Sequence, residues 1–169
     1  MTSSHLGAVL LAFVASALLL SGCQENRPIS GKVPTISLKS HSGETYTLAG
    51  EDKVVTLLVF WATWCQPCLM EMPALVKLHG KYRDRNFRVV SINVDDPEGQ
   101  KVKSISREYG INYPVLIGNE DVMKQFGGVT ALPTSFLIDR DGRIREKLQG
   151  LHPEEELERM VVTALDPAK

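Results

Sequence analysis

The sequence is poor in cysteine, in aromatic residues and in net charge. Only 3 of its 169 residues are cysteine, 7% are aromatic, and 19 basic residues nearly balance 20 acidic ones to leave a net charge of −1. Because no long run of one charge sign occurs, neither nucleic-acid binding nor a basic membrane-surface patch has electrostatic support. Hydrophobic residues make up 43% of the chain. This length and composition predict one globular domain with a real core, plus a targeting segment.

The targeting segment is an apolar run without charged residues, from Leu6 to Leu20. A bilayer-spanning helix needs about 20 apolar residues, so this run is too short to span comfortably and is typical of the central part of a secretory signal peptide. The residues that follow, Leu20-Ser21-Gly22-Cys23, resemble the lipobox of bacterial lipoproteins. In that family the signal peptide is removed before the cysteine, which is then lipidated.

The lipobox resemblance implies that residues 1–22 are a signal peptide, and that Cys23 carries a lipid and begins a tether over 23–34. A single domain over 35–169 then follows. The residues before the apolar run lack the Lys or Arg that such signals carry. An uncleaved anchor, or cleavage nearby with Cys23 left free, remain alternatives.

If Cys23 is lipidated, Cys65 and Cys68 remain as one close pair. A disulfide closing so short a loop adds little stability by loop closure. The pair therefore indicates reversible redox chemistry rather than a structural bridge. Two neighbouring core cysteines or a metal site are the alternatives, although one Cys-x-x-Cys supplies only two ligands and no second pair follows.

Hydrophobic periodicity and turn residues divide the domain into alternating strands and helices. Strands are predicted at 35–38, 45–48, 54–61, 87–94, 114–117, 134–139 and 144–148, and helices at 65–82, 98–109, 120–126 and 153–165. This order predicts the α/β class, with a mixed central sheet and helices on both faces. The inward face of the first helix is predicted to comprise Leu69, Met72, Leu75, Val76 and His79.

The cysteine pair lies where the strand at 54–61 gives way to the helix at 65–82. Cys65 is expected at the N-cap, where the positive end of the helix dipole and the unpaired N–H groups of the first turn favour a thiolate. Cys68 is one turn further on, and Cβ atoms at this spacing lie about 5–6 Å apart. Slight tightening brings them to disulfide distance. We therefore expect Cys65 to attack a substrate disulfide and Cys68 to resolve the mixed disulfide.

Three motifs together resemble the thioredoxin superfamily, and within it the TlpA/ResA-like branch of anchored extracytoplasmic thiol–disulfide oxidoreductases. The first is Phe60-Trp61-Ala62-Thr63-Trp64-Cys65-Gln66-Pro67-Cys68 with the helix proline Pro73. The second is Leu132-Pro133-Thr134 before a strand. The third is the inserted helix and strand over 98–117, together with the N-terminal hairpin. The likeness covers Pro34 to the C-terminus and implies a thioredoxin-like three-layer sandwich.

The second motif is similar to the cis-proline loop of that superfamily. The resemblance implies that Pro133 is cis and lies against the disulfide, and that the backbone around Leu132 pairs with an extended substrate segment. Thr134 is expected to bind substrate as part of the same loop. Trp61 and Trp64 are expected on the surface beside the site, with Trp64 lining the substrate groove. The alternative is an ordinary trans proline that begins a strand.

An acid is expected near the cysteines to accept the proton of Cys68 during resolution. Thioredoxins carry a buried aspartate at the position of Val59, whereas this branch places an acid at the end of the next strand, which corresponds to Asp96. Asp95 is the rival, and both aspartates could instead cap the turn before Pro97. Glu71 is expected on a solvated helix face.

The resemblance implies a periplasm-facing reductase of disulfides in exported proteins, with apocytochrome c as a frequent substrate class. It also implies a membrane electron donor of the DsbD or CcdA type, attachment to the membrane through the lipid, and no cofactor or metal beyond the thiols. The Gln66-Pro67 dipeptide does not fix the direction of electron flow.

The alternative function is a copper metallochaperone similar to the Sco family, which has Cys-x-x-x-Cys and a distant histidine. Here the spacing is one residue shorter, and the sequence assigns no role to the scattered His41, His79 and His152. A peroxidase is disfavoured because the Pro-x-x-x-Thr-x-x-Cys surroundings of peroxiredoxins are missing.

Overall fold

The structure is a computed structural model that describes residues 31–50 and 52–166. The predicted signal peptide, Cys23 and most of the predicted tether lie outside the described residues. Within the described part of the chain, no helix combines the length and the apolar character needed to cross a bilayer.

The elements follow the predicted order of strands and helices. They are β1 (Ile36–Lys39), β2 (Thr45–Leu48), β3 (Val55–Trp61), α1 (Gln66–Tyr82), a 3₁₀ turn (Arg83–Arg85), β4 (Phe87–Asn93), α2 (Gln100–Glu108), β5 (Val115–Ile117), α3 (Glu120–Gln125), β6 (Thr134–Ile138), β7 (Ile144–Gln149) and α4 (Glu154–Leu165). Each lies within two residues of its predicted bounds at both ends, apart from the 3₁₀ turn, which was expected only as a turn.

The main sheet has the strand order β5-β4-β3-β6-β7. The strands β5, β4 and β3 are parallel, whereas β6 and β7 run antiparallel to β3. The hairpin β1–β2 forms a separate two-stranded sheet. The mixed central sheet predicted from the element order is therefore confirmed.

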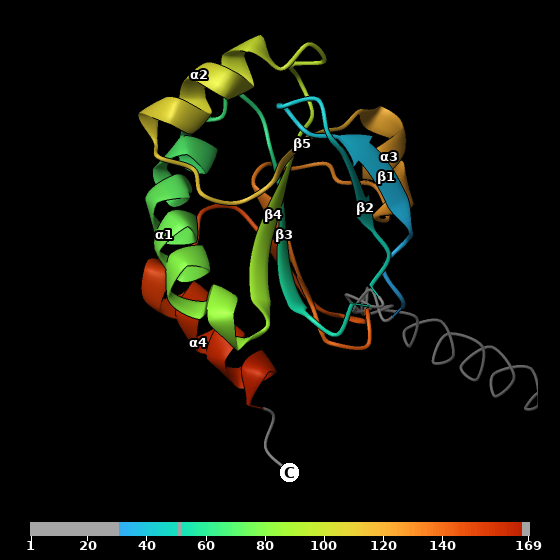
Figure 1. The fold of residues 1–169 in the computed structure, drawn as a ribbon, viewed down its shortest axis with the longest axis vertical. Helices are drawn as coiled ribbons and strands as arrows, with labels where there is room; N and C mark the ends of the chain where they lie inside the picture. Colours follow the sequence, from blue (N-terminus) through green and yellow to red (C-terminus); the bar gives the residue numbers. More distant parts are fainter. Residues whose placement is uncertain (1–30, 51, 167–169) are drawn as a thin grey trace, which may run out of the picture.

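Helices cover both faces of this sheet, as Figure 1 shows. Helices α1, α2 and α4 lie on one side, while α3 and the β1–β2 hairpin lie on the other. Strand β3 is buried at every position. Leu57 and Val59 pack toward the α1 side, and Leu58 and Phe60 pack toward the α3 side, because successive side chains of a strand point to opposite faces.

Trp61 is buried with 2% exposure, so the expectation that it lies on the surface was wrong. It is the last residue of β3 and continues the alternation of Leu57 and Val59 toward α1. Its neighbour Trp64, beyond the end of the strand, is 73% exposed. The strand pairing therefore separates the two tryptophans that the sequence placed together.

The inward face of α1 differs in part from the expected one. Leu69, Val76 and His79 are only half-buried. The fully buried residues of the helix are Cys68, Glu71, Met72, Leu75, Leu78 and Tyr82. Helix α1 packs against α4 as well as against the sheet, and this second contact widens the buried stripe toward Glu71. The expectation of a solvated Glu71 was therefore wrong.

The β6–β7 turn approaches the loop before β3 so closely that only glycine fits at Gly142. Its φ is +72°, and a Cβ there would collide with the backbone carbonyl of Gly50. Gly110 has a similar φ of +61° but open space around it. A Gly142→Ala variant is expected to lose about 2–3 kcal/mol in the free energy of unfolding. Gly110→Ala should lose about 1 kcal/mol, because it suffers only the strain of the left-handed backbone and no collision. Urea denaturation of both variants measures the difference, and equal losses would contradict the close approach.

Candidate active site

Cys65 and Cys68 form a disulfide at the start of α1, directly after β3. Their Cα atoms are 5.3 Å apart, and both residues are 3% exposed. Cys65 is the N-cap of the helix, and its Sγ accepts a hydrogen bond from the backbone N–H of Cys68 at 3.3 Å. Pro67 lies in the first turn, where its missing N–H leaves no helical bond unmade. The expected position of the pair at a helix N-terminus is confirmed.

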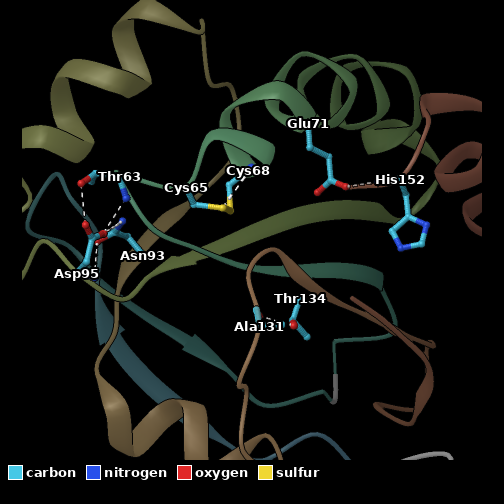
Figure 2. Close-up of a disulfide and its surroundings, with 9 residues drawn as sticks. All are labelled: Thr63, Cys65, Cys68, Glu71, Asn93, Asp95, Ala131, Thr134 and His152. Atoms are coloured by element: carbon cyan, nitrogen blue, oxygen red, sulfur yellow. Dashed lines mark hydrogen bonds between the residues drawn. A yellow bond between two sulfur atoms is a disulfide. The ribbon is translucent and has the colours of Figure 1, made fainter. Parts of the chain in front are cut away.

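Asp95 holds the loop that leads into Cys65. Its carboxylate accepts hydrogen bonds from the backbone N–H of Thr63 at 2.8 Å, from the Thr63 hydroxyl at 2.6 Å and from Asn93 Nδ2 at 2.8 Å (Figure 2). These bonds join the end of β4 to the segment between β3 and α1. Asp95 therefore fixes the approach of the chain to the disulfide.

Asp96 points to a different element. Its Oδ2 accepts a hydrogen bond from the backbone N–H of Val102 in α2 at 2.9 Å, and its own N–H donates to Asn93 Oδ1 at 2.9 Å. The carboxylate thus caps the first turn of α2, beyond Pro97, rather than the turn before Pro97 that the sequence left open as an alternative. The expected role of Asp96 as the proton acceptor of Cys68 gains no support from these contacts and stays a prediction.

The Leu132-Pro133 peptide bond is cis, as the resemblance implied. Thr134 pairs with Phe60 in the β3–β6 register, so the loop before β6 lies beside the end of β3, where the cysteine segment begins. The Thr134 hydroxyl closes this loop by donating to Ala131 O at 2.7 Å (Figure 2). Pro133 is buried and Leu132 is half-buried. The sheet register therefore brings two segments more than 60 residues apart to one edge.

Glu71 is the acid of this site that sequence reasoning missed. It follows Cys68 by one helical turn and is 2% exposed. Its Oε1 accepts a hydrogen bond from the backbone N–H of His152 at 3.1 Å, while its Oε2 is buried without a hydrogen-bond partner among the described residues. Burial raises the pKa of Glu71 to about 6, against the smaller lowering effects of the His152 N–H and of the His152 charge.

A signal for Glu71 was present in the sequence. Position 71 lies three residues after Cys68 and four before Leu75, which is the spacing of one helical face. A charged residue on a buried stripe requires a partner, and the partner, the N–H of His152, comes from 81 positions along the chain. That contact could not be read from the sequence.

Comparisons with known proteins agree with this geometry. A model described as the AhpC/TSA family matches residues 29–147. The thiol-disulfide oxidoreductase ResA of Bacillus thuringiensis (strain Al Hakam) is 33% identical over 135 residues, which cover 80% of this chain and 78% of that protein. The thioredoxin-like protein YneN of Bacillus subtilis (strain 168) is 34% identical over 139 residues, 81% of this chain and 78% of that protein. The chain is a TlpA/ResA-like member of the AhpC/TSA family.

Solved structures support the same assignment. The crystal structure of a putative thiol:disulfide interchange protein DsbE from Chlorobium tepidum has a TM-score of 0.73 and 30% identity, covering 80% of this chain and 96% of that one. The thioredoxin-like fold expected from the motifs is therefore confirmed. This TlpA/ResA-like protein is a thiol–disulfide oxidoreductase.

Two cavities in the described structure of this TlpA/ResA-like protein, of about 480 and 430 Å³, are lined by residues other than the cysteines and the cis-proline loop. In residues 31–50 and 52–166, no cluster of three or more His, Cys, Asp and Glu is placed to hold a metal ion. Trp64, which directly precedes Cys65, is 73% exposed and offers a large apolar surface of the kind that is enriched at protein–protein interfaces.

The raised pKa of Glu71 predicts a pH dependence of stability. The folded value of about 6 exceeds the ordinary value of 4.5, so the folded oxidised protein holds this proton more tightly than the unfolded chain does. The contribution of Glu71 to the free energy of unfolding is fully present below pH 4.5 and is lost as the pH rises through 6. The free energy of unfolding changes by about 2 kcal/mol over this range. Between pH 4 and pH 7, wild-type protein should therefore lose about 2 kcal/mol relative to Glu71→Gln.

Urea denaturation at both pH values, with the disulfide intact, measures this difference. Glu98→Gln, at an exposed glutamate, is the matched control and should follow the wild type. Parallel behaviour of wild type and Glu71→Gln would show that the Glu71 carboxyl is not perturbed.

Proposed function

We propose that this protein is an extracytoplasmic, lipid-anchored reductase of disulfides in exported proteins. The observation that carries the proposal is the Cys65–Cys68 disulfide at the N-terminus of α1, beside a cis-proline loop and the exposed Trp64. A redox pair placed at the rim of the sheet can meet a disulfide on a protein surface. The named relatives are thiol–disulfide oxidoreductases, which supports the class of reaction.

The reaction begins from the dithiol form. The thiolate of Cys65 attacks one sulfur of the substrate disulfide, forming a mixed disulfide and releasing the other substrate sulfur as a thiolate. Cys68 then loses its proton and attacks the Cys65 sulfur, which frees the second substrate thiol and closes the Cys65–Cys68 bond. Two electrons pass from the protein to the substrate. The N–H of Cys68, which contacts Cys65 Sγ at 3.3 Å, and the helix dipole favour the thiolate in the first step.

The substrate segment is proposed to lie along the cis-proline loop. Thr134 is paired within the sheet on both sides, and Pro133 O accepts a hydrogen bond from Gly150 N–H. The backbone of Leu132, just before the cis bond, is therefore where an extended chain can pair as an added strand. Trp64 offers a large exposed apolar surface next to Cys65. These contacts hold the substrate sulfur over Cys65 without requiring a particular side-chain sequence.

Glu71 is proposed to accept the proton of Cys68 in the second step. It is buried with Cys68 on the same helical stripe, and its pKa of about 6 keeps the carboxylate form dominant at neutral pH while leaving it a better base than an ordinary glutamate. Asp96, the acid expected from the sequence, has its carboxylate engaged at the N–H of Val102.

Two isosteric variants separate these acids. Glu71→Gln should slow closure of the disulfide from the mixed-disulfide state by about 10-fold or more and remove the acid limb near pH 6 from its pH profile. Asp96→Asn should leave that profile in place and change the rate by less than about threefold. Stopped-flow measurement of the tryptophan fluorescence during single-turnover reduction of a peptide disulfide gives both rates. The opposite ranking would return the proton-acceptor role to Asp96.

The location and the cycle of the enzyme are proposed from the lipobox and the family resemblance. Residues 1–22 would direct export, a lipid on Cys23 would tether the domain to the membrane, and residues 23–34 would form the tether. A membrane electron donor of the DsbD or CcdA type would return the disulfide to the dithiol state, and apocytochrome c is the proposed substrate class. No cofactor beyond the two thiols takes part in the proposed step.

Trapping of the mixed disulfide tests the roles of the cysteines. Cys68→Ala should retain exported substrates on Cys65 as mixed disulfides that mass spectrometry identifies after isolation from the membrane fraction. Cys65→Ala is the matched control and should retain none. Substrates held only by Cys65→Ala would reverse the two roles.

Equilibration of the wild type with glutathione tests the direction of electron flow. A reduction potential well above about −200 mV would indicate an oxidase rather than a reductase.

A further inference from the structure

His152 lies between the end of β7 and the start of α4, at the point where this segment meets α1. Its backbone N–H donates to Glu71 Oε1 at 3.1 Å, and its imidazole Nδ1 lies 3.0 Å from Glu156 Oε2 (Figure 2 shows Glu71 and His152). Its Nε2 is buried without a partner among the described residues, as is Glu71 Oε2. One residue thus contacts the buried acid through its backbone and a second acid through its ring.

The other ionisable groups around Glu71 do not compensate its charge. Tyr113 is buried, and its pKa is raised by burial and by the negative charge of Glu71, so it stays neutral. Lys77 is directed across the α1–α4 contact to Glu154 at 2.8 Å. The Cys65–Cys68 pair brings a further negative charge when it is reduced to a thiolate. His152, in the segment before α4, is the residue whose charge lowers the pKa of Glu71.

We propose that His152 is a positioning residue for the exchange reaction: its N–H orients the Glu71 carboxylate, and its imidazolium, held by Glu156, stabilises the charged form of that carboxylate. The inference rests on the proposed function, because its consequence is a Glu71 that stays ionised at lower pH and continues to accept the proton of Cys68. His152 touches neither sulfur in the described hydrogen bonds, so its effect passes through Glu71.

The physical basis is the low polarity of the site. A charge interaction is screened far less between buried groups than between groups in water. The His152 side chain is only 19% exposed. The bond from its backbone N–H to Oε1 fixes the residue beside the carboxylate, while its ring extends toward Glu156 (Figure 2 shows Glu71 and His152). An imidazolium there lowers the pKa of Glu71, opposing the rise caused by burial.

The first test is a titration of Glu71 that does not depend on activity. In full-length oxidised protein labelled with ¹³C at the glutamate carboxyl, the Glu71 signal is assigned by its loss in Glu71→Gln, and its wild-type midpoint is expected near 6. His152→Gln, which keeps the backbone N–H but carries no charge, should raise the midpoint so that the ratio of carboxylate to carboxylic acid at pH 6 falls about threefold. His152→Lys should restore the wild-type midpoint or lower it.

His41→Gln is the matched control, since it removes one imidazole from the β1–β2 turn, where the ring contacts Val115 O, and it should not move the Glu71 midpoint. Circular dichroism confirms that each variant is folded, and His152→Asn provides a second uncharged replacement. An unchanged midpoint in the folded His152→Gln and His152→Asn variants would overturn the proposal. So would an equal change in His41→Gln.

The second test measures the exchange reaction itself. His152→Gln should move the acid limb of the single-turnover pH profile to higher pH, and it should have no such effect in a Glu71→Gln background. A shift that persists without Glu71 would show that His152 acts by another route and would overturn the proposal. If the wild type reduces no protein disulfide at all, the proposed function fails. If the wild type is active but the Glu71 midpoint is the same in His152→Gln as in the wild type, only the role of His152 is overturned.

Discussion

The junction of β3 with α1 is the constraint on which the rest of the site depends. Strand β3 is buried along its whole length and paired on both sides, so its end cannot move relative to the sheet. The chain then turns through a loop held by Asp95 and enters α1 with Cys65 as the N-cap. The position of the helix N-terminus, and with it the environment of the sulfur, is set by the core rather than by the loop.

Three carboxylates near this junction have different roles because their surroundings differ. Asp95 accepts three hydrogen bonds and braces the loop before Cys65, while Asp96 caps α2. Glu71 accepts one hydrogen bond from a backbone N–H and is otherwise buried. Hydrogen bonds satisfy a carboxylate, whereas burial leaves it with a raised pKa. Glu71, whose Oε2 is buried without a hydrogen-bond partner among the described residues, is therefore the one suited to exchange a proton.

Helix α4 contributes to the site although it lies far from the cysteines in the sequence. The segment just before it places the His152 N–H against Glu71, and the ion pairs Lys77–Glu154 and Lys81–Glu158 join the helix to α1. This packing buries Glu71, since a helix covered by the sheet alone would leave that side open to water. The C-terminal helix thus helps to determine the chemistry of the cysteine pair as well as the stability of the core.

The order of the elements, the mixed sheet and the N-cap position of Cys65 could be predicted from the sequence, because they follow from local periodicity and helix-end chemistry. The cis-proline loop at Pro133 was implied by the family resemblance of a short motif. The buried face of α1, the burial of Trp61 and the partner of each acid became visible only in the folded chain. Those outcomes depend on α4 packing against α1 and on the register of β3 with its neighbours. Such contacts join residues up to 81 positions apart, and no local pattern specifies them.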